Sequence, residues 1–252
     1  TTLLVGSVRW AEETVGGRGL SQPLRGIYDG DNYWASWGEA YRRQGFPAET
    51  LEQVMAENPA KSYVDSGAAT ITPLADGESF SVGNRTFTCI VTPGHTPGHG
   101  CLYEAATQTL VLGDHVLFTI TPNITAWDIL PNALGHYLAS LEKIRPLAVK
   151  LALPAHREQG EVTLTARTDQ LIAHHVERLQ EALSILSQEG GLTTYQVASR
   201  MTWSIRAKSW EDFPMAQKWF AVGEAQSHLD LLLWKGKIRR EGQKLYTYYV
   251  VE

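Results

Sequence analysis

Three strand-like segments of this chain each run into a polar side chain that can bind a metal or carry a proton. Their β-branched, aromatic and apolar residues predict strands. Strand ends lie at the edge of a sheet, where α/β proteins place their sites, so we expect the three side chains to converge. The segments and the side chains that follow them are 85–91 with His95, 109–112 with Asp114, and 149–153 with His156.

Strand and helix patterns are mixed along the first 160 residues. Strands and helices in one stretch favour a layered α/β (α+β) domain. The segment 132–144 carries apolar residues at the i, i+3, i+4, i+7 spacing of an amphipathic helix. Besides the segments above, we expect strands at 70–74 and 101–104 and helices at 7–15, 34–44 and 48–57.

Beyond residue 160 the pattern is helical until a final hairpin. We expect helices over 166–187 and 219–234, and between them a short helix opened by the capping-box pattern at Thr193. The segments 238–240 and 245–250 flank a turn at Glu241-Gly242 and predict the hairpin. Three helices and a hairpin are typical of a winged helix. The predicted organisation is a sheet-containing domain at 1–160, a connecting helix at 161–189 and a winged-helix domain at 190–252.

Charge and cysteine content limit the kinds of binding partner and the cellular compartment that we expect for this chain. The net charge of −5 gives no general attraction for nucleic acid or anionic membranes. No apolar run approaches the roughly 20 residues of a membrane span, and no signal peptide opens the chain, so we expect a cytoplasmic protein. Cys89 and Cys101 are the two cysteines. We expect reduced thiols packed in the core; a disulfide is the alternative if their strands are neighbours.

Two imidazoles and one carboxylate are a donor set that catalytic zinc prefers, with a position left for water. A single histidine at a strand end is more often a hydrogen-bonded surface or core residue. Three such strand ends in one domain favour a metal site. The glycines and prolines of TPGHTPGHG at 92–100 would fix the backbone around His95 before metal arrives, which reduces the ordering cost of binding.

The chain resembles the second half of the metallo-β-lactamase-fold hydrolases. The resemblance rests on TPGHTPGHG at 92–100, LVLGDHVL at 110–117 and LPAH at 153–156. TPNI at 121–124, AHHVERL at 173–179 and VGEAQSHL at 222–229 are similar to the branch of that family that ends in a winged helix. The resemblance implies a partial αββα sandwich followed by a winged helix.

The same resemblance implies roles for the three strand-end residues. His95 would be a metal ligand, Asp114 would bridge two metals and act in catalysis, and His156 would bind the second metal. The implied cofactor is zinc, two ions in a complete site. The implied reaction is attack of a metal-activated water on a small-molecule ester, thioester or lactone.

The sequence departs from the family in one large respect, because the H-x-H-x-D-H motif is absent and His95 is the first histidine. LVGSVRWAEET at 4–14 resembles the segment that normally follows that motif. We therefore expect a truncated or impaired form that holds one metal or none. Loss of half a sandwich would expose apolar sheet surface, so we also expect a homodimer.

The remaining histidines receive less specific expectations. His99 is expected to support the site or the fold, and His115 to pack or hydrogen-bond beside Asp114. His174 and His175 point about 100° apart on a helix, so one of them could line a substrate cleft. His228 is expected to be buried in the C-terminal domain.

Two other functions stay open. The first is RNA or phosphodiester processing, or nucleic-acid binding, through the winged helix; it is not favoured, because the chain is acidic. The second is a non-catalytic remnant of the fold. The residues behind the first alternative are Lys235, Lys237, Arg239, Arg240 and Lys244.

Overall fold

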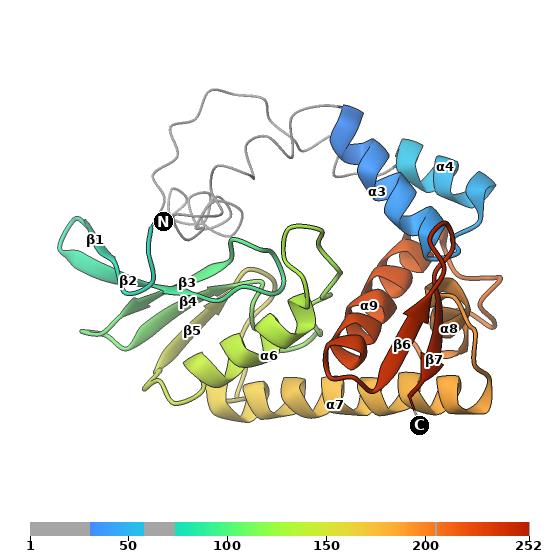
Figure 1. The fold of residues 1–252 in the computed structure, drawn as a ribbon. Coiled ribbons are helices and arrows are strands. Elements are labelled where there is room, and N and C mark those ends of the chain that lie inside the picture. The colour runs from blue at the N-terminus through green and yellow to red at the C-terminus, as the bar shows by residue number, and fades with distance from the viewer. Residues whose placement is uncertain (1–30, 58–73, 205, 252) are drawn as a thin grey trace. The chain divides into compact units, whose positions relative to one another are not determined.

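The computed structural model describes residues 31–57, 74–204 and 206–251 (Figure 1). These residues fall into two compact units, one of residues 74–175 and one of 31–57 together with 176–251. The helix predicted at 7–15 and all but the last residue of the strand predicted at 70–74 lie outside the described residues.

A five-stranded sheet forms the base of the first unit, with its strands in the order β1-β2-β3-β4-β5. The first four strands are antiparallel, and β5 pairs with β4 in parallel. The three predicted strands that become β2, β3 and β4 are confirmed to within one residue, and β5 begins two residues later than predicted. The strands are β1 (Ser79–Val82), β2 (Arg85–Val91), β3 (Gly100–Glu104), β4 (Thr109–Gly113) and β5 (Leu151–Pro154).

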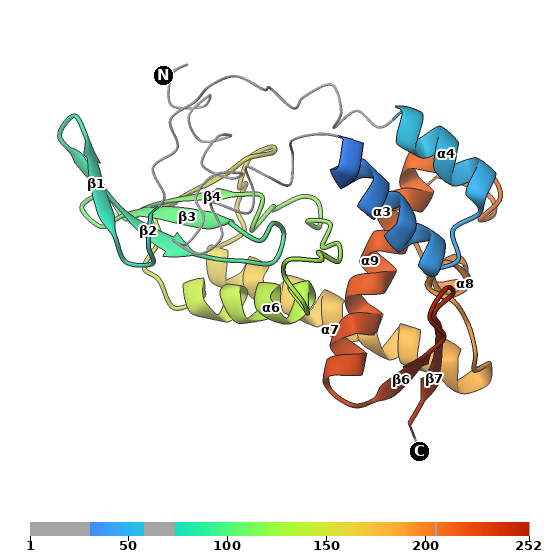
Figure 2. The same cartoon turned by 45° about the horizontal axis from the view of Figure 1, so that its top comes forward.

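Helix α6 (Ala133–Ile144) lies against one face of this sheet, on the same side as the first part of α7 (Figure 2). The side chain of Asn132 caps α6 by accepting a hydrogen bond from the amide of Gly135. Leu134, Tyr137 and Leu141 of the predicted apolar stripe are fully buried. The helix predicted at 132–144 is therefore confirmed.

The two cysteines are buried and are not joined by a disulfide. Cys89 lies opposite Leu102 in the register of β2 and β3, and Cys101 lies opposite Ile90. Successive residues of a strand face opposite sides of the sheet, so the two sulfurs point away from each other although their strands are neighbours. Burial raises the pKa of the Cys89 thiol to about 11, which keeps it protonated and unreactive.

The second unit joins segments from both ends of the chain. Its sheet is the predicted hairpin β6–β7, in which Ile238 pairs with Val250. Glu241 pairs with Thr247, so the turn follows Glu241 instead of including it as predicted. Tyr41 of α3 stacks on Trp219 of α9, with ring centroids 3.6 Å apart. Residues 31–57 therefore group with the C-terminal helices, whereas the sequence placed them in a domain at 1–160. The elements are α3 (Asp31–Arg43), α4 (Ala48–Glu57), α8 (Thr194–Arg200), α9 (Met215–Trp234), β6 (Ile238–Glu241) and β7 (Thr247–Val250).

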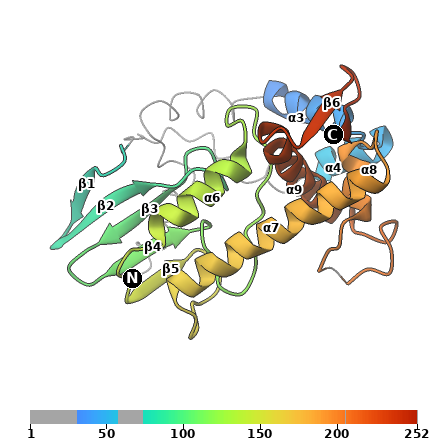
Figure 3. The same ribbon diagram turned by 60° about the horizontal axis from the view of Figure 1, so that its bottom comes forward.

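Helix α7 (Leu164–Gln188) is continuous through the boundary between the units (Figure 3). The apolar residues of this helix predict a buried stripe that includes Val176, but Val176 is 43% exposed. The buried positions are polar there instead, with His175 and Arg178 facing inward.

The capping box at Thr193 is confirmed. Among the described helices, none is long and apolar enough to cross a membrane.

Candidate metal centre

The first unit brings His95, Asp114 and His156 together. Nε2 of His95 lies 3.8 Å from Oδ2 of Asp114, and Nε2 of His156 lies 3.4 Å from Oδ1 of Asp114. The carboxylate thus stands between the two imidazoles and turns one oxygen toward each. The side chain of Asp114 is 18% exposed and that of His156 is 57% exposed, so the group opens to solvent on the His156 side.

An irregularity at the end of β4 aims Asp114. The register with β5 shifts between Val111 and Gly113, and Gly113 has a positive φ of 57°. Bulges of this kind turn a side chain out of the regular alternation of a strand. The amide of Ala155 then donates to the carbonyl of Gly113 at 2.9 Å. This bond ties the ends of β4 and β5 together one residue before His156.

Two backbone hydrogen bonds close the His95 loop (residues 92–100), which packs against α6. The amide of Thr92 donates to the carbonyl of His99, and the amide of Gly94 donates to the carbonyl of Thr96. Gly94 has φ 145° and lies so close to Tyr137 that an added Cβ would be 2.5 Å from the Tyr137 Cα. The loop conformation therefore requires glycine at this position.

The hydrogen bond of the His95 ring identifies which of its two nitrogens donates a proton to the backbone. Nδ1 lies 2.9 Å from the backbone carbonyl of Asn123. A carbonyl oxygen only accepts, so Nδ1 carries the proton and donates it. In the neutral ring Nε2 then presents a lone pair toward the Asp114 carboxylate. Two electron-rich atoms that face each other are stabilised by a cation between them.

The chemistry of these donors fits a zinc ion. Oδ1 of Asp114 is buried without a hydrogen-bond partner among the described residues, and an orphaned carboxylate oxygen is costly unless a cation compensates it. Ligands of one tetrahedral zinc lie about 3.3 Å apart, close to the 3.4 Å between His156 and Asp114. Over the described ranges, no three His, Cys, Asp or Glu side chains are arranged to hold a metal ion. The donors instead form two pairs that share Asp114.

The other histidines of the site prediction pack behind these donors. His99, His115 and His175 are fully buried, whereas His174 is partly exposed. The hydroxyl of Thr92 lies 2.8 Å from Nδ1 of His99. Desolvation lowers the pKa of His99 well below its ordinary value and lowers that of His115 to about 3. Both rings are therefore neutral at physiological pH.

Tyr137 lies at the centre of these buried rings. Its ring contacts His115 and His175 edge-on, with centroids 5.1 and 5.4 Å apart, and its hydroxyl donates to the carbonyl of His115. His175 therefore supports the fold rather than lining an open surface. The sequence showed Tyr137 only as part of an apolar stripe.

Three contacts that hold the His95 loop from outside it were not predicted from the sequence. These are the carbonyl of Asn123, the indole of Trp127 and the hydroxyl of Ser140. A backbone carbonyl leaves no signal in a sequence. The TPNI segment pointed to the right stretch of chain without indicating its role.

Comparison with known proteins gives consistent matches. A family model described as the metallo-beta-lactamase superfamily matches residues 26–156. The lactamase-like protein nscB of Aspergillus fumigatus is 26% identical over 73% of this chain and 64% of its own length. The nscB protein of Neosartorya fischeri is 30% identical over 58% of this chain and 46% of its own length. The chain thus spans less than two thirds of these relatives.

Two solved structures share the fold. A beta-lactamase domain protein from Burkholderia ambifaria has a TM-score of 0.71 and 26% identity, covering 84% of this chain and 60% of its own. A metallo-beta-lactamase family protein from Thermus thermophilus has a TM-score of 0.71 and 24% identity, covering 94% of this chain and 76% of its own. The second likeness concerns the fold alone.

Proposed function

The chain belongs to the metallo-β-lactamase superfamily, and on that basis we propose that it is a zinc-dependent hydrolase of small-molecule esters, thioesters or lactones. Superfamily membership supports hydrolysis in general. The ester, thioester or lactone class is our inference from the resemblance of the motifs around His95, Asp114 and His156 to that superfamily. The observation that carries the proposal is the Asp114 carboxylate. It directs Oδ2 toward Nε2 of His95, and it directs Oδ1, which is buried and has no hydrogen-bond partner among the described residues, toward Nε2 of His156.

Each of the three side chains has a defined task in this proposal. The His95 ring donates a hydrogen bond from Nδ1, so that in the neutral ring Nε2 has a lone pair available to bind a metal. Asp114 offers one oxygen toward each histidine, which lets it serve one metal position or two adjacent ones. His156 is the most exposed of the three, and substrate would enter on its side. When bound, zinc lowers the pKa of a water molecule toward neutrality and polarises the acceptor carbonyl.

We also propose that these 252 residues alone bind zinc weakly and hydrolyse slowly. The sequence has no H-x-H-x-D-H motif. The described residues hold only donor pairs, not a set of three. A site with few ligands leaves the metal less tightly held and supplies less stabilisation to the developing oxyanion.

Zinc affinity of Asp114→Asn tests the site directly. We expect affinity, measured by competition with a chromophoric chelator, to fall more than about 100-fold, beyond the range typical of changes outside the ligand set. His136→Asn is the matched control, because His136 is an exposed histidine on α6 and its loss should leave affinity unchanged. Turnover of an aryl ester, an acyl thioester and an acyl lactone should fall with zinc content. Equal zinc affinity in Asp114→Asn and wild type would refute the site.

A second candidate, nucleic-acid binding through β6–β7, rests on exposed basic side chains. The guanidinium groups of Arg239 and Arg240 lie over the rings of Tyr249 and Tyr246 at 4.4 and 4.2 Å. Arg239 also pairs with Glu241, which offsets part of the charge, so we favour hydrolysis of a small molecule. Binding of a short single-stranded RNA at low salt, lost at about 0.5 M salt, would favour the second candidate instead.

A further inference from the structure

We propose that Trp127 is a positioning residue for His95. Its indole N–H, together with the backbone carbonyl of Asn123, sets the direction in which the free nitrogen of His95 points. The inference rests on the proposed metal site, and it concerns a residue that neither lies in the ligand set nor follows from the motifs.

A single short segment holds both the main chain and the ring of His95. Nε1 of Trp127 donates to the backbone carbonyl of His95 at 3.2 Å. The His95 ring donates from Nδ1 to the carbonyl of Asn123, only four residues earlier than Trp127, at 2.9 Å. The first bond fixes the peptide that follows the His95 Cα, and the second fixes the ring about its side-chain torsions. Together they define the position of Nε2.

The segment that makes these bonds is itself anchored. Ile124 is fully buried and Leu130 is 8% exposed, so both ends are held in the core. The amide of Leu130 donates to the carbonyl of Trp127 at 3.1 Å and closes a turn between these two residues. Upstream, Arg167 donates to the carbonyls of Leu117 and Ile120. The indole is therefore presented from a fixed support.

Helix α6 holds the residues that precede His95. The hydroxyl of Ser140 donates to the carbonyl of Pro93 at 2.9 Å, and Gly94 is packed against Tyr137. The peptide before His95 is thus fixed by α6 and the peptide after it by Trp127. Without the indole bond, the second peptide can rotate and the ring loses its alignment with the carbonyl of Asn123.

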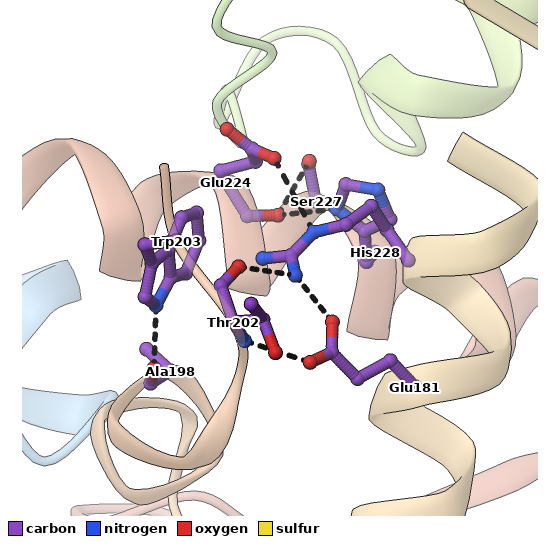
Figure 4. A network of polar contacts seen from close by, with 8 residues as sticks. Glu181, Ala198, Thr202, Trp203, Glu224, Ser227 and His228 are labelled. Atoms are coloured by element: carbon purple, nitrogen blue, oxygen red, sulfur yellow. Dashed lines mark hydrogen bonds and ion pairs between the residues drawn. The ribbon is translucent and has the colours of Figure 1, made fainter. Parts of the chain in front are cut away.

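Trp127→Phe tests the role, because it removes the N–H donor and keeps an aromatic ring of similar shape. We expect zinc affinity by chelator competition to fall about 10-fold, the lower end of the range for residues that orient a ligand. Trp203→Phe is the matched control. Trp203 is also half-buried, and its indole donates to a backbone carbonyl, that of Ala198, at 2.8 Å in the other unit (Figure 4). This control should keep wild-type zinc affinity.

A second measurement needs no metal and separates this inference from the proposed function. Long-range ¹H–¹⁵N correlation spectra of the metal-free protein, recorded at mildly alkaline pH, report the tautomer of each imidazole. Wild type should show His95 protonated on Nδ1 alone, and Trp127→Phe should show a mixture of both tautomers.

The outcomes are distinct. A wild-type protein without measurable zinc affinity, with the tautomer shift still present in Trp127→Phe, overturns the metal site and supports the positioning role. An unchanged tautomer in Trp127→Phe overturns the positioning role, whatever the zinc affinity. Equal loss of zinc affinity in Trp127→Phe and Trp203→Phe also overturns it, because the effect would then come from general loosening of the fold.

Discussion

Gly94 is the residue of the His95 loop whose identity is most tightly constrained. Its φ of 145° disfavours any L side chain. An added Cβ would meet the Cβ of Tyr137 and two backbone atoms of the same residue, the Cα at 2.5 Å and the amide nitrogen at 2.8 Å. Backbone atoms of a helix cannot move aside as the tip of a side chain can. A side chain at this position would therefore displace the loop and, with it, the donor nitrogen of His95.

Gly94→Ala should destabilise the protein by about 2–4 kcal/mol, the sum of backbone strain and overpacking. Gly77→Ala is the matched control, because Gly77 also has a positive φ, of 78°, but an added Cβ there meets open space. We expect only the strain of about 1–2 kcal/mol at that position. Urea unfolding followed by circular dichroism measures both. Similar losses in the two variants would show that contact with Tyr137 does not matter.

At the scale of elements, α6 acts as a support for the end of β2 and the His95 loop. Three side chains of α6, at positions 137, 140 and 143, contact the chain at Gly94, Pro93 and Val91 in turn. This spacing of three residues matches one face of a helix. Lys143 donates to the carbonyl of Val91 at 2.8 Å and to the carboxylate of Asp76 at 2.6 Å. The amide of Val91 donates to the same carboxylate.

The Asp76 clamp, formed by Asp76, Lys143 and the amide of Val91, should make stability depend on pH in the acidic range. Desolvation alone would raise the pKa of Asp76, but the bonds from Lys143 and the amide of Val91 outweigh it and lower the pKa below its ordinary value. Because the pKa is lowered in the folded state, the clamp contributes fully to the free energy of unfolding above the unfolded pKa of about 4. This contribution is lost as pH falls through the folded pKa.

Asp76→Asn should therefore lose at most about 1 kcal/mol at neutral pH, because the pair with Lys143 is largely solvent-exposed. The difference from wild type should shrink as the pH is lowered toward ~2, because protonation of Asp76 removes the charge that Lys143 contacts. Urea unfolding at both pH values measures it. Asp128→Asn, which removes an exposed carboxylate, provides the comparison. A difference for Asp76→Asn that grows on acidification would contradict the assignment.

At the scale of the whole molecule, two units with different kinds of core share helix α7. The first is centred on the sheet and buried imidazoles. The second is held partly by a buried charge, Arg178, whose side chain is 8% exposed. Its guanidinium contacts Glu181, Glu224 and the carbonyl of Thr202, the partners labelled in Figure 4. It also lies 4.4 Å from the ring centroid of Trp203. These contacts join α7, α9 and the segment after α8.

Arg178→Met should destabilise the second unit by about 3–5 kcal/mol, because it leaves the carboxylates of Glu181 and Glu224 without their cation. Arg200→Met is the control, since the pair of Arg200 with Glu189 is exposed and should contribute at most about 1 kcal/mol. Thermal unfolding monitored by tryptophan fluorescence follows this unit through Trp203 and Trp219. Equal effects of the two substitutions would show that burial does not govern the Arg178 contacts.

Local patterns in the amino-acid sequence were enough to predict strands β2 to β5 and helix α6 of the first unit, several elements of the second unit, and the candidate donors. The strand β2, the helix α6, the capping box at Thr193 and the C-terminal hairpin all follow from side-chain periodicity and turn residues. These signals are local, because each depends on residues within one or two turns of the chain. The three motifs are also local patterns, with glycine before Asp114 and with glycine and proline around His95. Their order along the chain indicated the superfamily.

How those donors are held and how the elements group depends on tertiary contacts that no local pattern predicts. The carbonyl of Asn123 and the indole of Trp127 reach His95 across 28 and 32 residues of sequence. Packing of Tyr41 on Trp219, 178 positions apart, places residues 31–57 with the C-terminal helices. Tertiary packing also places Arg178, instead of Val176, on the buried face of α7. Such contacts depend on which surfaces meet after the chain collapses, and a backbone carbonyl or a buried charge has no local pattern that announces its partner.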